Sequence, residues 1–207
     1  MPAALVCYQS ACRERFPIQA VLYNCPRCGG LLEVGYDGKP GDPETLKRTW
    51  RERRTTNQPL DASGVWRYRE MIDFLPGYGQ VVTLREGNTP LLEAPGAARY
   101  AGLDRLVFKH QGFNPTGSFK DNGMTCGVAQ ALRLGVRKVA CVSTGNTSAS
   151  MAAYAAHAGM EGIVFFQDRQ IALGKLSQAI AYGATCVQIS ADFDRNLALV
   201  REIAGAL

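Results

Sequence analysis

The sequence predicts an α/β fold in which a parallel sheet carries helices on both faces, preceded by a small cysteine-rich module. After residue 79, short β-branched runs alternate with segments whose apolar residues recur at helical spacing. Strands separated by helices of this length need crossover connections, which favour parallel pairing. Four of the seven cysteines lie within the first 28 residues, so the start of the chain forms a unit of its own.

The elements expected in the main domain can be placed in order along the chain. The expected strands cover residues 81–84, 106–109, 139–143, 163–166 and 186–189. The expected helices cover residues 118–134, 147–158, 173–182 and 193–206. Gly135, Gly159 and Gly183 stand directly after three of these helices, where a left-handed residue commonly ends a helix. The resulting division has three parts: a cysteine module at 1–34, a connector at 35–79 and the main domain at 80–207.

The connector is expected to be ordered. Its prolines interrupt a basic helix at residues 44–54 and a shorter helix at 65–74. A disordered linker is poor in aromatic residues, whereas this segment contains Trp50, Trp66, Tyr68 and Phe74. We therefore expect it to pack against the domain that follows.

The clustered cysteines are Cys7, Cys12, Cys25 and Cys28, and their arrangement resembles a zinc ribbon. Two closely spaced thiol pairs can each sit on a tight turn and converge on one tetrahedral metal ion. The four-residue gap in the first pair is wider than the commonest spacing, so a metal-free module is the alternative. Cys126, Cys141 and Cys186 lie in apolar contexts and are expected to be small buried hydrophobic residues.

Composition excludes several classes of protein. The net charge of +5 is modest, and its main cluster, at residues 47–54, is expected to be a solvated helix face rather than a nucleic-acid contact. No apolar run approaches the roughly 18 residues that cross a bilayer. The first residues lack the pattern of a secretory signal. We therefore expect a cytoplasmic protein without membrane or nucleic-acid partners.

The segment at residues 113–122 leads into the first long helix of the main domain. Ser118 is the expected N-cap, with Asp121 three residues later as a capping-box acid. Lys120 then lies in the first turn, at the positive end of the helix dipole, which disfavours its protonated form. A lysine with a lowered pKa is suited to imine chemistry, although a lysine at a helix start is more often simply exposed.

The residues around Lys120 make the functional interpretation of this segment more specific. Gly-Phe-Asn-Pro-Thr-Gly-Ser-Phe-Lys-Asp at 112–121 resembles the cofactor-lysine segment of pyridoxal-phosphate enzymes with the tryptophan-synthase-like fold, and of threonine synthases among them. The resemblance implies that the cofactor is pyridoxal 5'-phosphate. It also implies that Lys120 is both the residue that binds the cofactor and the catalytic residue.

A second segment, Ser-Thr-Gly-Asn-Thr-Ser-Ala-Ser at 143–150, closes an expected strand and opens a helix. Its small and hydroxyl-bearing residues could bind a carboxylate or phosphate through backbone N–H groups, and an ordinary capped turn is the alternative. The segment is similar to the asparagine loop of the same enzymes. This implies that Asn146 hydrogen-bonds the cofactor hydroxyl and that Ser143, Thr144 and Thr147 bind the substrate carboxylate.

Two further segments extend the resemblance. Glu-Gly-Asn-Thr-Pro-Leu at 86–91 is similar to the entry motif of the catalytic domain, and Ala-Leu-Gly-Lys-Leu at 172–176 to a segment whose lysine faces the substrate phosphate. An exposed helix lysine remains an equally good interpretation of Lys175. A cysteine module before the catalytic domain fits threonine synthases better than the related dehydratases.

The implied reaction converts O-phospho-L-homoserine and water into L-threonine and phosphate, with Lys120 moving protons on the substrate. The glycine-rich loop for the cofactor phosphate and the hydroxyl residue at the pyridine nitrogen are expected after residue 207. We therefore expect this chain to be the front part of a longer, homodimeric enzyme and to be inactive alone. A threonine or serine dehydratase is the nearest alternative. A non-enzymatic zinc-ribbon adaptor, binding nucleic acid through residues 48–54, is the alternative from another class.

Overall fold

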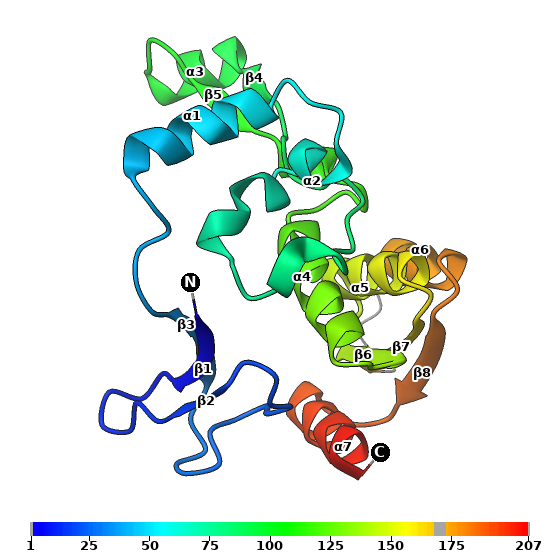
Figure 1. The fold of residues 1–207 in the computed structure, drawn as a ribbon. Helices are drawn as coiled ribbons and strands as arrows, with labels where there is room; N and C mark the ends of the chain where they lie inside the picture. Colours follow the sequence, from blue (N-terminus) through cyan, green and yellow to red (C-terminus); the bar gives the residue numbers. More distant parts are fainter. Residues whose placement is uncertain (1, 168–172, 207) are drawn as a thin grey trace. The chain divides into compact units, whose positions relative to one another are not determined.

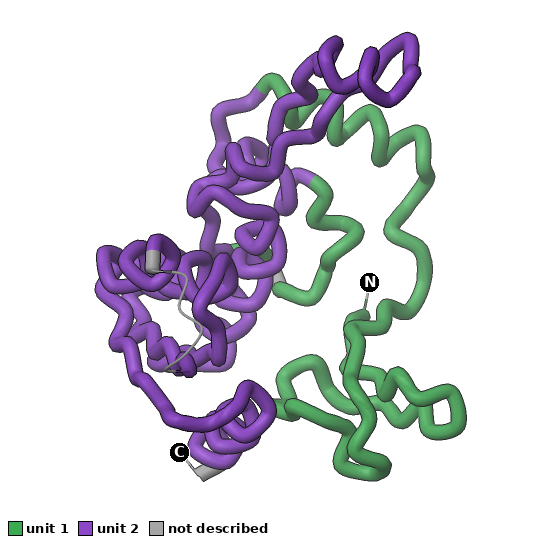
Figure 2. The backbone as a smooth tube through the Cα atoms, turned by 180° about the vertical axis from the view of Figure 1, so that it is seen from behind, with its two compact units in different colours: residues 1–55, 68–79 green, residues 56–67, 80–207 purple. Residues whose placement is uncertain are grey.

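The computed structural model describes residues 2–167 and 173–206. The chain divides into two compact units, shown in different colours in Figure 2. The first consists of Met1–Thr55 and Tyr68–Gly79, and the second of Thr56–Arg67 and Gln80–Leu207. The segment expected to be a connector thus contributes to both units. The boundaries expected at residues 34 and 79 stay predictions.

The first unit contains a three-stranded antiparallel sheet. Strand β1 (Ala3–Cys7) lies at its centre, between β2 (Arg15–Pro17) and β3 (Leu32–Tyr36). Leu5 is aligned with Phe16 on one side and with Val34 on the other, so apolar residues face one another across the strands. The sheet holds the end of β1, where Val6 and Cys7 are buried.

Helix α1 (Pro43–Arg53) confirms the basic helix expected in this region. The Asp42 carboxylate caps it by accepting a hydrogen bond from the Thr45 N–H at 2.9 Å, and Pro43 occupies the first helical position. The second expected helix is instead a 3₁₀ segment, Trp66–Met71, which is shorter than predicted and bends at Tyr68. A further 3₁₀ turn, Pro76–Tyr78, follows it.

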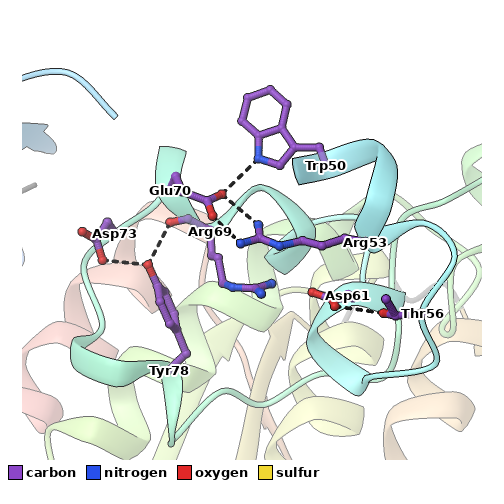
Figure 3. Close-up of polar contacts among 8 residues, drawn as sticks. All are labelled: Trp50, Arg53, Thr56, Asp61, Arg69, Glu70, Asp73 and Tyr78. Atoms are coloured by element: carbon purple, nitrogen blue, oxygen red, sulfur yellow. Dashed lines mark hydrogen bonds and ion pairs between the residues drawn. The ribbon is translucent and has the colours of Figure 1, made fainter. Parts of the chain in front are cut away.

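Glu70 organises the polar contacts of this part of the first unit (Figure 3). Its carboxylate accepts hydrogen bonds from the Trp50 indole N–H at 3.0 Å and from Arg53 Nη1 at 2.9 Å, and it also pairs with Arg53 Nη2. Burial by itself raises the pKa of Glu70, but the bonds from Arg53 and Trp50 outweigh it and lower the pKa to about 2. Helix α1 is thereby tied to the 3₁₀ segment that carries Glu70.

The second unit contains the predicted parallel sheet. Its strands are β6 (Lys138–Val142), β7 (Glu161–Gln167) and β8 (Thr185–Ile189), in the order β6-β7-β8. The helices are α4 (Lys120–Arg133), α5 (Asn146–His157), α6 (Leu173–Ala181) and α7 (Phe193–Ala206). Figure 1 shows α5 and α6 on one side of the three strands and α7 on the other. Three strands and four helices of the prediction are thus confirmed, with ends that differ from it by no more than two residues.

The sheet is only partly parallel, because two of the expected strands lie outside it. β5 (Val107–Lys109) pairs antiparallel with β4 (Leu91–Glu93) instead, and helix α3 (Pro95–Ala101) connects the two. Residues 81–84 form no strand. The carbonyl of Val82 accepts the Thr125 hydroxyl at 2.6 Å and the N–H of Leu84 donates to the Glu86 carboxylate at 3.1 Å. Side chains therefore satisfy backbone groups that a strand would have paired.

The glycines expected at helix ends are confirmed. Gly135, Gly159 and Gly183 all have positive φ, between 68° and 82°. In each case the next residue donates to the carbonyl five positions earlier, as Val136 does to Ala131 at 3.0 Å, which is the bond of a Schellman motif. These ends set the positions at which β6, β7 and β8 begin.

The core of the second unit lies between the helices and the parallel strands. Its buried members come mainly from α5 and β7: Met151, Ala152, Ala153, Tyr154, Ala155, Val164 and Phe166. The small residues of α5 let this helix approach the sheet closely, since alanine adds little between backbones. Among the described residues, no helix combines the length and hydrophobicity that a bilayer crossing requires.

Two glycines allow the backbone to cross itself beside the short helix α2 (Pro59–Ala62). The N–H of Gly64 donates to the carbonyl of Glu86 at 2.6 Å. A Cβ on Gly64 would lie 2.3 Å from the Asn88 nitrogen and 2.7 Å from the Gly87 Cα. Any other residue at position 64 would therefore push two backbone segments apart.

Replacing Glu70 with glutamine tests the link between α1 and the 3₁₀ segment. The pKa of Glu70 is lowered from 4.5 to about 2. Its contribution to the free energy of unfolding is therefore complete above pH 4.5 and is lost as the pH falls toward 2. We expect Glu70→Gln to lower the free energy of unfolding by about 2 kcal/mol at pH 7, and the difference to vanish near pH 2. Urea unfolding at several pH values measures it. Glu44→Gln, which removes an exposed partner of Lys47, should change little, and equal effects of the two variants would contradict the prediction.

The crossing at Gly64 predicts an asymmetry between two glycines. Gly64→Ala should lower the free energy of unfolding by about 3 kcal/mol, because the clash involves backbone atoms that cannot turn away. Gly127, inside α4, has nothing within 4 Å of an added Cβ, so Gly127→Ala should raise it by about 0.5–1 kcal/mol. Urea unfolding of both variants checks this, and a Gly64→Ala protein as stable as the parent would refute it.

Candidate active site

Lys120 is the first residue of α4, as expected for a lysine in the first helical turn. The predicted capping box is wrong, however. The residue that precedes the helix is Phe119, and no side chain caps the helix there. Ser118 Oγ accepts from the Lys120 N–H at 3.3 Å, while the Asp121 carboxylate turns away from the helix end toward the preceding loop. The helix consequently begins two residues later than predicted.

Asp121 is fully buried and holds together three segments around Lys120. One carboxylate oxygen accepts the Thr116 N–H at 2.8 Å. The other accepts the hydroxyls of Thr116 and of Ser150, both at 2.6 Å. Thr116 lies in the loop before Lys120 and Ser150 lies on α5. The Asp121 carboxylate therefore joins this loop to α5.

A second buried carboxylate, Glu86, lies in the entry motif. It accepts the Tyr154 hydroxyl of α5 at 2.6 Å and also the hydroxyls of Ser63 and Thr83. Burial, together with the adjacent Glu86 charge, raises the pKa of Tyr154, which keeps its hydroxyl available as a donor. The next residue, Gly87, donates its N–H to Asn114 Oδ1 at 2.8 Å. The entry motif is thereby attached both to α5 and to the loop that precedes Lys120.

The asparagine loop runs from the end of β6 into α5. Ser143 donates its N–H to the Phe165 carbonyl at 3.0 Å, and its hydroxyl oxygen accepts the Gly145 N–H at 3.1 Å. Helix α5 begins at Asn146 with no side-chain cap, so the N–H groups of its first turn remain available to an anion. Thr144 and Thr147 are half-buried beside them.

Two polar groups that the sequence predicts to contact a cofactor are accessible in this arrangement. Within the described residues, neither the Lys120 amine nor the Asn146 amide has a hydrogen-bond partner, and the Lys120 nitrogen lies 4.9 Å from the centre of the Phe119 ring. Phe119 is itself more than half exposed. An accessible amine, a free amide and an uncapped helix start therefore fit a planar, anionic cofactor.

Lys175 is half-buried rather than extended into solvent. Its amine donates to the Thr116 carbonyl at 3.2 Å and to Gln178 Oε1 at 3.1 Å, and Gln178 Nε2 donates to the same carbonyl at 3.2 Å. A lysine amine has three N–H donors, so one remains for a ligand. Lys175 thus brings a positive charge to the loop that precedes Lys120. Ala172, the first residue of its motif, lies outside the described residues.

The four clustered cysteines converge as the sequence predicts. All four sulfur atoms lie within 4.8 Å of one another, with 3.4 Å between Cys7 and Cys28 and 3.8 Å between Cys12 and Cys25. A tetrahedral zinc ion with Zn–S bonds of about 2.3 Å requires sulfur atoms roughly 3.8 Å apart. A Cβ on Gly30 would lie 3.3 Å from two of these sulfurs, so glycine leaves room for the cluster. The geometry is compatible with a zinc ribbon.

Several residues that shape the site are missing from the prediction. The sequence pattern does not single out Thr116 or Ser150, it predicts a different partner for Asp121, and it does not connect Glu86 with Tyr154. One signal was present: Asn146, Ser150 and Tyr154 are spaced by four residues, which places them on one face of a helix. The partners of that face come from far away in the sequence, so spacing alone could not identify them.

Comparisons with known proteins agree with the geometry. Residues 82–206 match the family described as pyridoxal-phosphate dependent enzyme. The chain is 42% identical over 195 residues to a threonine synthase of Methanocaldococcus jannaschii, covering 93% of this chain and 45% of the relative. It is 49% identical over 148 residues to a threonine synthase of Synechocystis, covering 68% and 39%. The chain thus spans less than half the length of these curated relatives.

Solved structures share the fold. Maize serine racemase superimposes with a TM-score of 0.52 at 21% identity, covering 58% of this chain and 36% of that one. Diaminopropionate ammonia lyase of Escherichia coli, in its apo form, gives 0.52 at 15% identity, covering 83% and 46%. The matched family covers more than half of the chain, including both loops around Lys120 and Asn146. This chain therefore belongs to the family of pyridoxal-phosphate dependent enzymes.

Proposed function

We propose that this chain provides the cofactor-lysine part of a threonine synthase, which converts O-phospho-L-homoserine and water into L-threonine and phosphate. The observation that carries the proposal is 42% identity to a threonine synthase over 93% of the chain. The cysteine cluster and the free Lys120 amine support it. The residue roles given below are parts of the same proposal.

Pyridoxal phosphate, when bound, supplies an electron sink for the substrate's reacting carbons. Lys120 holds the cofactor and its amine removes and returns protons at the substrate's α and β carbons. Because Lys120 begins a helix and precedes a buried, fully bonded Asp121, its main chain is fixed while its side chain stays free to move. Asn146 orients the cofactor through its amide.

Substrate binding is assigned to the same region. The open N–H groups at the start of α5 suit the substrate carboxylate, with the hydroxyls of Ser143, Thr144 and Thr147 beside them. The remaining N–H donor of Lys175 suits the substrate phosphate, because an ammonium attracts a dianion strongly at short range. Two anion sites would thus hold the two ends of O-phospho-L-homoserine.

We also propose that Cys7, Cys12, Cys25 and Cys28 bind one structural zinc ion. The small sheet β1–β3 buries little apolar surface, and a metal would fix the two turns that carry the thiols. The homodimer, the cytoplasmic location, the lack of nucleic-acid and membrane partners and the inactivity of this chain by itself stay predictions.

The proposed reaction is tested with the full-length protein that the gene encodes. With O-phospho-L-homoserine we expect release of phosphate and formation of L-threonine. Lys120→Ala should abolish the yellow absorption of the bound cofactor and lower kcat by about 10³-fold or more, since positioned proton transfer contributes about 10²–10⁴-fold. Lys138→Ala removes an exposed partner of Glu161 and should leave kcat and colour unchanged.

The same assay separates the alternatives. Ammonia release from L-threonine without phosphate release from O-phospho-L-homoserine would reject the proposal in favour of a dehydratase. A colourless protein that shifts nucleic acid in a salt-sensitive gel would favour the adaptor.

Zinc is tested by metal analysis of the purified chain. We expect about one zinc ion per chain, and about none in Cys28→Ser, because removing one ligand leaves a three-thiol site. Cys28 is the most exposed of the four thiols, so this variant leaves buried packing largely intact. Cys186→Ser, outside the cluster, is the matched control and should retain its zinc. A parent chain purified without metal and unable to take up added zinc would support the metal-free alternative.

A further inference from the structure

Helix α5 offers one face to two buried carboxylates. Ser150 donates to Asp121 and Tyr154 donates to Glu86, each at 2.6 Å. Asn146 lies four residues before Ser150, so all three side chains project from the same face of α5. Asn146, which is proposed to orient the cofactor, thus lies one helical turn before Ser150. The Ser150 hydroxyl in turn donates to Asp121, the residue that follows Lys120.

The two contacts differ in what they join. Tyr154 meets a carboxylate that also has Ser63, Thr83 and the Leu84 N–H as donors, so the place of Glu86 does not depend on α5 alone. Asp121 instead takes its other bonds from Thr116, which belongs to the loop before Lys120. Among the described residues, Ser150 is the only donor from α5 to this carboxylate.

We propose that Asp121 and Ser150 are positioning residues that fix the loop of Lys120 against the start of α5, so that Lys120 and Asn146 meet one cofactor. The proposal deepens the proposed function and rests on it. Asp121 does not cap α4, and all three of its bonds run to the loop or to α5. Misplacing reacting groups by 1 Å can lower a reaction rate about 10²-fold. The link from Asp121 to Ser150 therefore bears on the placement of the cofactor as well as on stability.

The test compares Ser150→Ala, Asp121→Ala and Asp121→Asn with Tyr154→Phe, which removes from the same helix a phenolic hydroxyl that also donates to a buried carboxylate at 2.6 Å. The first measurement is amide hydrogen exchange of peptides covering residues 113–120, without cofactor. We expect exchange about tenfold faster in Ser150→Ala and Asp121→Ala, the factor expected for loss of a hydrogen bond to a carboxylate. Tyr154→Phe should match the parent in this peptide, although its overall stability falls.

The second measurement is the fraction of Lys120 that carries pyridoxal phosphate at limiting concentration, fixed by borohydride reduction and located by peptide mapping. Ser150→Ala and Asp121→Ala should need about tenfold more cofactor than the parent and Tyr154→Phe. Asp121→Asn should lie near the parent, because its amide can accept from Thr116 and donate to hydroxyls that rotate. This rescue would not occur if the charge at the helix start were the function of Asp121.

The outcomes separate the inference from the function on which it rests. Equal effects of Ser150→Ala and Tyr154→Phe on exchange and on cofactor uptake would show a general loss of stability and overturn the positioning role. If the parent, tested as the full-length protein, takes no cofactor on Lys120, the proposed role of that lysine is refuted, while the exchange measurement would still decide whether Ser150 and Asp121 hold the loop.

Discussion

The proposed cofactor site depends on the hydrogen bonds that hold two buried carboxylates in place, above all the bond from Ser150 of α5 to Asp121. Asp121 and Glu86 are fully buried, and such charges are stable only when hydrogen bonds replace water. Here the donors are hydroxyls and backbone N–H groups of the lysine loop, of the residues just before the entry motif, of Ser63 and of α5. These bonds replace the water that the two carboxylates lose, and they favour one arrangement of the segments, in which the Lys120 amine and the Asn146 amide have no hydrogen-bond partner among the described residues.

The parallel sheet supplies the frame for this network. The asparagine loop follows the carboxyl end of β6, next to the parallel strand β7, and leads into α5. The carboxyl ends of the strands are where such folds bind ligands. The alanines of α5 pack on these strands, while Ser150 and Tyr154 face the carboxylates. One helix therefore joins the apolar core to the polar network, which explains why small residues and hydroxyls share it.

In the first unit, order comes from different interactions. The short strands β1, β2 and β3 have few buried side chains, and this unit also contains the convergent thiols and the polar contacts of Glu70. Four sulfurs placed within 4.8 Å of one another would repel as thiolates without a cation. The proposed zinc ion would remove that repulsion and join the turns that carry the thiols.

The sequence by itself determined the parallel strands, the helices with their glycine ends and the lysine and asparagine loops, because these depend on local periodicity and on motifs read within one segment. It did not determine that Asp121 bonds to Ser150, that residues 81–84 form no strand, or that β5 pairs with β4. Those features depend on partners far away in the chain. Lys120 could thus be proposed as the cofactor lysine from ten neighbouring residues, whereas the contacts that hold its loop in place were decided by the tertiary structure.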